Sequence, residues 1–240
     1  MNDDREGFVP LYPEHPIRVP VFEKVPRGMD PMVVGDQGWV PLSSFEGCLD
    51  GNDAIAIGTG PSFEAILDAG YRDLGDFWTM GVNRVLRRFR PDFYVCAESR
   101  SDDLWKLIDE ADPTFVFSTS VAVHRRAIRF HSNANVWLTR KGNVPNLAGA
   151  MSTWYAAALL AYFGAKTIGV LGVDLTGHHH FSHPSALPSQ DRQWEMLRRV
   201  LAGRGQKLVN LSEDSLLTAL PKVSFDNLRH RGRTTRPPMA

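Results

Sequence analysis

The stretch AIAIGTGPSFEAILD, residues 54–68, changes its hydrophobic pattern half-way along. Its first four residues are a continuous apolar run, as in a parallel strand that helices cover on both faces. The turn Gly-Thr-Gly-Pro-Ser follows over residues 58–62, and the residues after it are apolar at helical spacing. Glycine lets a backbone approach a bulky group closely, and proline is tolerated in the first turn of a helix. We therefore predict a buried strand that passes through a tight turn into a helix.

The same alternation of apolar runs and helical patterns continues along the chain. We expect strands at 53–58, 76–82, 92–98, 114–119, 135–139, 166–174 and 207–212. We expect helices at 62–69, around 85–89, and at 101–110, 149–163 and 189–203. Gly164 is expected to end the fourth of these in a left-handed conformation. The alternation predicts the α/β class, with a Rossmann-like open, mostly parallel sheet and helices on both faces.

Both ends of the chain depart from this pattern. Residues 1–48 contain seven prolines, each of which removes a backbone donor, so we predict a proline-rich N-terminal arm. Residues 226–240 are basic and include two prolines, so we predict a flexible tail. The Rossmann-like domain then occupies residues 49–225.

The composition argues against several classes of protein. The 240 residues are 43% hydrophobic and 22% charged, as in a globular domain, and 27 basic side chains offset 27 acidic ones. The balanced charge gives no reason to expect nucleic-acid binding or attraction to an anionic membrane. Cys48 and Cys96 are too few and too far apart for a metal knuckle, and we expect both to be reduced. We find no signal peptide and no long apolar span, and expect a cytoplasmic protein.

The turn after the first predicted strand is a candidate anion site. It consists of Gly58, Thr59, Gly60, Pro61 and Ser62. Open α/β sheets bind ligands at the carboxyl ends of their strands, and a helix N-terminus carries partial positive charge toward a phosphate. The sequence matches neither G-x-G-x-x-G nor G-x-x-x-x-G-K-[ST], so a tight turn without a ligand is an equal alternative.

Three polar residues follow other predicted strands and would lie at the same edge of the sheet: Asn83, Glu98 and Asp174. The Asn83 amide offers one donor group and one acceptor to a base, a ribose or a substrate hydroxyl. Structural roles are the alternative for all three, because Asn is common in turns and acidic residues cap helices and loops.

The segment 148–183 adds two further features. Small residues at the start of its helix, including Gly149 and Ser152, would let a ligand or a strand approach closely. The later run HHHFSH, residues 178–183, offers imidazole groups that exchange protons near neutral pH. Adjacent histidines rarely face one ion together and no H-x-x-x-H spacing on a helix is visible, so we predict no metal site.

Several motifs together resemble a known group of proteins. IGTGPSFE, GVNR, PDFYVCAE, the small-residue helix with AYFGAKTIGVLGVDLTG, then HHHFSHP and LVNLSEDSLLTALP follow the order found in the 6-hydroxymethylpterin diphosphokinase-like domain family. The same series resembles the bacterial sialyltransferases of glycosyltransferase family 42, which have a Rossmann-like fold and need no metal. The resemblance covers roughly residues 50–222.

The resemblance implies roles for individual residues. In the sialyltransferases the Gly-Asn-Gly-Pro-Ser loop holds the nucleotide of the donor, which implies that role for residues 58–62, although Thr59 replaces the usual asparagine. It implies donor contact by Asn83, and places Gly149 and Ser152 near the nucleotide. Phe181-Ser182-His183 matches the motif that carries the catalytic base, so His183 is the first candidate and His180 the second.

The sequence therefore predicts a transferase that binds a nucleotide-activated donor, in particular a sialyltransferase-like glycosyltransferase that passes a sugar to a hydroxyl acceptor. No cofactor is required in that case. The sequence leaves open whether the chain forms a homo-oligomer. One alternative is a pterin-type diphosphokinase that uses ATP and Mg²⁺, the latter held by carboxylates such as Glu98 and Asp174. Another is a nucleotide-binding module without catalysis, which is favoured because Thr59 replaces the asparagine usual in the sialyltransferases.

Overall fold

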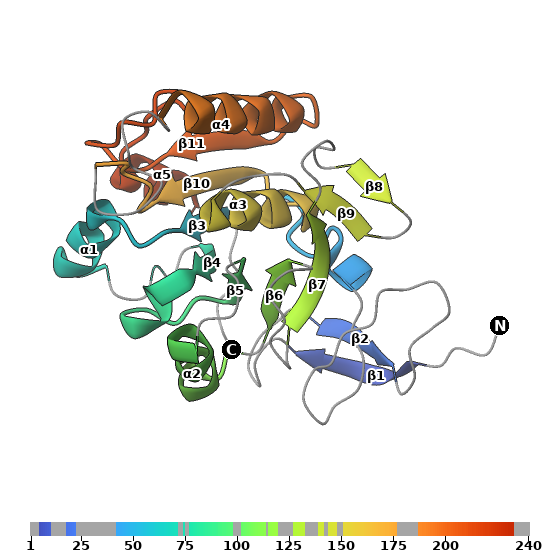
Figure 1. Ribbon diagram of the computed structural model, residues 1–240. Coiled ribbons are helices and arrows are strands. Elements are labelled where there is room, and N and C mark those ends of the chain that lie inside the picture. Colours follow the sequence, from blue (N-terminus) through green and yellow to red (C-terminus); the bar gives the residue numbers. More distant parts are fainter. Residues whose placement is uncertain are drawn as a thin grey trace.

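The computed structural model describes residues 5–10, 18–22, 42–71, 74, 77–97, 102–113, 115–119, 127–132, 139–141, 144–147, 151–176 and 187–232 (Figure 1). Within these ranges nine strands form one sheet in the order β11-β10-β3-β4-β5-β6-β7-β9-β8. The strands are β3 (Asp53–Ile57), β4 (Trp78–Val82), β5 (Phe93–Cys96), β6 (Val116–Thr119), β7 (Ala127–Ser132), β8 (Thr139–Lys141), β9 (Val144–Leu147), β10 (Thr167–Leu171) and β11 (Lys207–Asn210). Each neighbouring pair is parallel except β8 and β9, so the predicted open, mostly parallel sheet is confirmed.

Helices cover both faces of this sheet. They are α1 (Pro61–Asp68), α2 (Asp102–Ala111), α3 (Ser152–Tyr162), α4 (Leu187–Ala202) and α5 (Phe225–Gly232), with the short 3₁₀ helices η2 (Leu42–Phe45) and η3 (Asn83–Arg87). The buried clusters place α3, α4 and η2 on one face, and α1, α2, η3 and α5 on the other. In β3, Ala54 and Ala56 contact the first face, while Ile55 and Ile57 contact the second. The continuous apolar run at 54–57 is therefore explained by burial on both sides.

Helix α3 is buried all round. Every residue from Thr153 to Tyr162 is buried, because the sheet lies on one side of the helix and α4 and η2 close the other. The helix ends at Tyr162 and Gly164 follows shortly after it with φ +98°, while Ala165 N donates to Leu160 O at 3.0 Å. This is the left-handed cap that the sequence predicted.

The predicted elements differ from the structure at a few places. The pattern around 85–89 forms the 3₁₀ helix η3 rather than an α-helix, and strands β7 and β9 of the large sheet were not predicted. The predicted strand 135–139 lies outside the described residues except for its last residue, which begins β8. In none of the described segments is a helix long and apolar enough to cross a membrane.

The two predicted end segments contain ordered elements. In the N-terminal segment, β1 (Arg5–Pro10) and β2 (Arg18–Phe22) pair antiparallel, and η2 brings Leu42 and Phe45 fully into the core. Residues 42–48 therefore belong to the main domain rather than to an arm. The predicted tail begins inside α5, where Leu228 is buried, and Phe225 at the start of this helix packs against Tyr71 and Phe77.

Candidate functional site

The sheet has one point where the direction of winding reverses, between β3 and β10. From β3 the chain winds through β4, β5, β6 and β7 on one side, and it later returns to β10 and continues to β11 on the other. The helices that follow β3 and β10, α1 and α4, therefore lie on opposite faces of the sheet. Doubly wound α/β proteins bind ligands at such a switch point. The loops concerned are residues 58–62 and 172–174, as the sequence predicted.

The two loops are joined closely by backbone hydrogen bonds. Gly58 N donates to Leu171 O at 2.7 Å, and Gly60 N donates to Gly172 O at 2.9 Å. A Cβ atom at Gly58 would lie 2.5 Å from Gly172 O, and one at Gly60 would collide with the Asp174 carboxylate. The glycines are thus required for the contact between the loops. An anion site was predicted here, but the amides of Gly58 and Gly60 already have acceptors within the protein.

The N-terminus of α1 is also occupied, by Asp174. Ser62 N donates to Asp174 Oδ2 at 2.9 Å, and Pro61 takes the first position of the helix, where no donor is needed. The Ser62 hydroxyl lies 2.6 Å from Ser212 Oγ and accepts from Gly172 N at 3.1 Å. A carboxylate therefore stands where a phosphate was expected, and the positive end of α1 already faces a negative charge.

Asn83 lies at the carboxyl end of β4, beside β3. It has φ +52°, a left-handed conformation that asparagine tolerates better than most residues, and its carbonyl oxygen accepts from Tyr94 Oη at 2.6 Å. Its side-chain oxygen Oδ1 is buried and has no hydrogen-bond partner. The same holds for Oδ1 of Asp174, a residue that is only 5% exposed. Two buried acceptors therefore flank the turn that follows β3.

The N-terminus of α3 has a different character. Its N-cap residue is Met151, no side chain caps the helix, and the first turn contains no acidic residue. Its first backbone hydrogen bond is donated by Trp154, so the amides of Ser152 and Thr153 precede the bonded part of the helix. The Thr153 hydroxyl lies 3.0 Å from the position of a Cβ at Gly58 and belongs to a residue that is 4% exposed. This helix end offers donors at the switch point.

A cavity of about 300 Å³ lies beside α1, and Ser62, Ala65 and Ile66 of that helix line it. Its lining includes Tyr71 and Phe225 together with the carboxylates of Glu213, Asp214 and Asp226. Negative charge at this wall disfavours a phosphate, so the anionic part of a ligand is better accommodated on the α3 side of the turn.

The predicted site residues divide into two groups. The structure brings residues 58–62, Asn83, Ser152 and Asp174 to one edge of the sheet. Glu98, Gly149, His180 and His183 lie outside the described residues, so their roles remain predictions. Across the described ranges no group of three His, Cys, Asp or Glu side chains is arranged to hold a metal ion.

The motif LVNLSEDSLLTALP includes the loop after β11, but no residue of this loop was predicted to have a role in the site. Ser212 contacts Ser62, Ser215 Oγ donates to Val173 O at 2.6 Å, and Leu216 N donates to Asp174 O at 2.9 Å. This loop holds the Asp174 backbone in place. The signal was available, because residues 211–216 directly follow a predicted strand and contain two serines.

The fold and the switch-point site define a doubly wound α/β protein with a candidate ligand site at the carboxyl edge of its sheet. No family model matches the sequence, and no curated protein matches it. The fold is similar to that of the MAf glycosyltransferase from Magnetospirillum magneticum AMB-1, with a TM-score of 0.51 and 14% sequence identity. The similarity covers 83% of this chain and 38% of the MAf glycosyltransferase. This chain therefore spans well under half of the length of that enzyme. The chain therefore has a glycosyltransferase-like fold.

Proposed function

We propose that the chain is a glycosyltransferase-like transferase that binds a nucleotide-activated sugar at the switch point and passes the sugar to a hydroxyl acceptor. The observation that carries the proposal is the uncapped N-terminus of α3 beside the β3 turn. The similarity of fold to a glycosyltransferase supports it.

The chemistry needs a site for the departing anion. Two backbone amides and the hydroxyls of Ser152 and Thr153 lie at the positive end of an eleven-residue helix. Donors placed in this way stabilise the negative charge that develops as the sugar–phosphate bond breaks. The Asp174 carboxylate keeps an anion away from α1, so a donor phosphate is directed to α3.

The acceptor must lose a proton as its oxygen attacks the anomeric carbon. We assign this proton to His183, on the resemblance of Phe181-Ser182-His183 to the motif of the sialyltransferases. An imidazole with a pKa near 6.5 accepts a proton at neutral pH. The electron pair of the broken bond leaves with the nucleotide phosphate.

One experiment tests the phosphate site. Calorimetric titration of CMP, UDP, GDP and ATP, each with and without Mg²⁺, should identify a nucleotide that binds without the metal. Thr153→Val should weaken that binding about tenfold or more, because a hydrogen bond to a charged group is lost. Thr167→Val, at the opposite end of β10, is the matched control and should bind as wild type. Equal affinity of wild type and Thr153→Val would exclude α3 as the phosphate site.

A second experiment tests the base. His183→Ala should abolish sugar transfer and leave nucleotide binding nearly intact, whereas His179→Ala should retain transfer. Transfer by His183→Ala at the wild-type rate would remove His183 from the mechanism.

The unpartnered oxygen of Asp174 favours one second candidate, an ATP- and Mg²⁺-dependent diphosphokinase. Magnesium prefers oxygen ligands and bridges phosphates, and a carboxylate oxygen at the ligand edge suits it. Tight binding of ATP that requires Mg²⁺ in the same titration would select this function. Tight binding of a nucleotide with no turnover of any donor would indicate a module without catalysis.

A further inference from the structure

Hydrogen-bond donors and buried hydrogen-bond acceptors lie at different places around the turn that follows β3. Donors lie at the α3 N-terminus, on the first face of the sheet. Unpartnered acceptors lie at the ends of the two strands that flank β3, as Asn83 Oδ1 after β4 and Asp174 Oδ1 after β10. A ligand that fits both must carry an anion at one end and neutral hydrogen-bond donors at the other.

Asp174 is held so that its second oxygen cannot easily turn away. Oδ2 accepts from Ser62 N, the backbone oxygen accepts from Leu216 N at 2.9 Å, and Val173 O accepts from Ser215 Oγ. Oδ1 is left buried without a donor. A buried charged oxygen without a partner is costly, and a hydroxyl that donates to it forms a strong, charge-assisted hydrogen bond.

Asn83 is held in a comparable way. Its left-handed backbone is fixed by the hydrogen bond from Tyr94 Oη, at 2.6 Å, to its carbonyl oxygen. Its amide side chain therefore stays at the carboxyl end of β4, where Oδ1 is buried without a donor. A carboxylate on one side and an amide oxygen on the other suit a ligand that presents more than one hydroxyl.

We propose that Asp174 and Asn83 bind the sugar hydroxyls of the nucleotide, with Asp174 Oδ1 accepting from a ribose hydroxyl. This inference rests on the proposed function, because it assumes a nucleotide whose phosphate lies at α3. In this proposal the Asp174 carboxylate selects nucleotides whose sugar carries hydroxyl groups over nucleotides whose sugar lacks them. Asp174 then has two roles, one oxygen capping α1 and the other binding the ligand.

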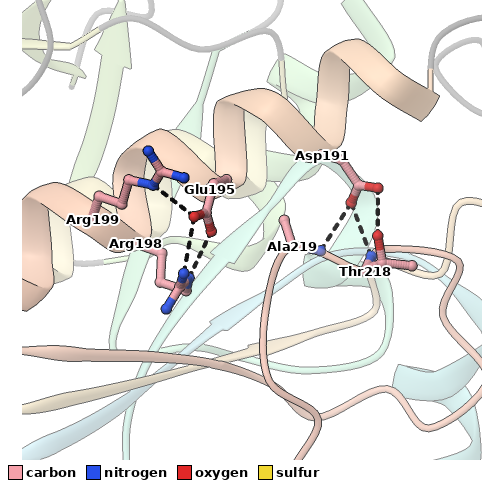
Figure 2. A network of polar contacts seen from close by, with 6 residues as sticks. All are labelled: Asp191, Glu195, Arg198, Arg199, Thr218 and Ala219. Atoms are coloured by element: carbon pink, nitrogen blue, oxygen red, sulfur yellow. Dashed lines mark hydrogen bonds and ion pairs between the residues drawn. The ribbon is translucent and has the colours of Figure 1, made fainter.

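The test compares ribo and 2′,3′-dideoxy forms of CMP, UDP, GDP and ATP by calorimetry. Wild type should bind the ribo form of its nucleotide about 10- to 100-fold more tightly than the dideoxy form. Asp174→Ala should remove most of this difference, as a double-mutant cycle measures. Asp191→Ala is the matched control, because Asp191 also accepts from backbone amides, those of Thr218 and Ala219 (Figure 2), but belongs to α4. It should keep the wild-type difference.

A second variant covers the case in which Asp174→Ala fails to fold. Asn83→Gly removes the other acceptor without straining the left-handed backbone, and should reduce the same difference. Equal binding of both forms by wild type overturns the inference but leaves the proposed function standing. An unchanged difference in Asp174→Ala and Asn83→Gly also overturns it, as does a difference that exists only with Mg²⁺, which would make Asp174 a cation ligand. No binding of any nucleotide by wild type overturns both.

Discussion

Two carboxylates on α4 show how residues of one type take different roles at the scale of the single residue. Asp191 accepts from Thr218 N at 2.9 Å and Thr218 Oγ1 at 2.7 Å, and so ties the helix to the loop after β11 (Figure 2). Glu195, one turn later, faces the guanidinium groups of Arg198 and Arg199 on its own helix. The first links distant segments, and the second stabilises the helix locally.

The Glu195 pair predicts a pH dependence. Hydrogen bonds from Arg198 and then Arg199 lower the pKa of Glu195 from 4.5 to about 2. Because the folded protein favours the charged form, the stabilisation is complete above about pH 4.5 and is lost as the pH falls toward 2. Glu195→Gln should therefore lower the melting temperature at pH 7. The difference in melting temperature between this variant and wild type, the gap, should narrow below pH 4.5.

Circular dichroism melting curves between pH 7 and pH 3 measure this gap. Glu110→Gln is the control, since Glu110 lies at 3.7 Å from Lys106 in an exposed pair on α2. A gap for Glu195→Gln that is the same at every pH would contradict the assignment.

At the scale of the element, the end of α3 depends on one glycine. Gly164 has φ +98°, and a Cβ there would collide with the Asp50 side chain. Leu49 N also donates to Phe163 O at 2.6 Å, so the residues before β3 bind the carbonyl end of the helix. The C-terminus of α3 is therefore fixed by a left-handed residue and by a packed neighbouring segment, which in turn fixes the position of its N-terminus at the site.

Gly164→Ala should lower the free energy of unfolding by about 1–3 kcal/mol, because it adds both backbone strain and a steric clash. Gly203→Ala, after α4, is the matched control. Its Cβ would meet Val200 O at 3.5 Å and Arg199 O at 3.7 Å, both ordinary contacts, so the stability of the variant should stay within about 1 kcal/mol of wild type. Urea unfolding at equilibrium measures both variants, and equal stability of the two would disprove the role of Gly164.

At the scale of the whole molecule, η2 completes the core. Phe45 is fully buried, and its ring centroid lies 5.0 Å from that of Phe115, 5.1 Å from that of Phe117 and 5.3 Å from that of Phe163. These rings come from the segment leading into β6, from β6 itself and from the end of α3. A segment that precedes the sheet in sequence therefore joins the far end of α3 to the middle of the sheet.

Phe45→Ala should destabilise the protein by about 3–5 kcal/mol, the usual cost of a large aromatic side chain removed from a core. Phe45→Leu should cost less, because it fills more of the space. Leu216→Ala is the control, since Leu216 is 48% exposed and its loss should change stability by less than about 1 kcal/mol. Chemical denaturation gives all three values. A Phe45→Ala variant as stable as wild type would show that residues 42–48 do not support the domain.

Local patterns were sufficient to predict much of the fold. The run at 54–57 indicated a strand buried on both faces, and Pro61 and Gly164 indicated where helices begin and end. Helix α5 was missed, because only Phe225 and Leu228 of its residues are apolar and buried, and its basic sequence is typical of a tail. Strand β7, AIRFHS, was missed because polar and charged residues interrupt its apolar run.

By itself, the sequence determined which residues lie at the carboxyl ends of the strands, because the pattern of side chains close together in the sequence indicates where each strand and helix lies. Only the tertiary structure decided what those residues contact. Asp174 caps α1 through Ser62, 112 residues earlier, and this follows from the parallel pairing of β3 with β10. That pairing turns an expected phosphate site into a capped helix and leaves the N-terminus of α3 uncapped. Local periodicity contains no information on which strands will be neighbours, because pairing depends on how the whole sheet buries its two faces.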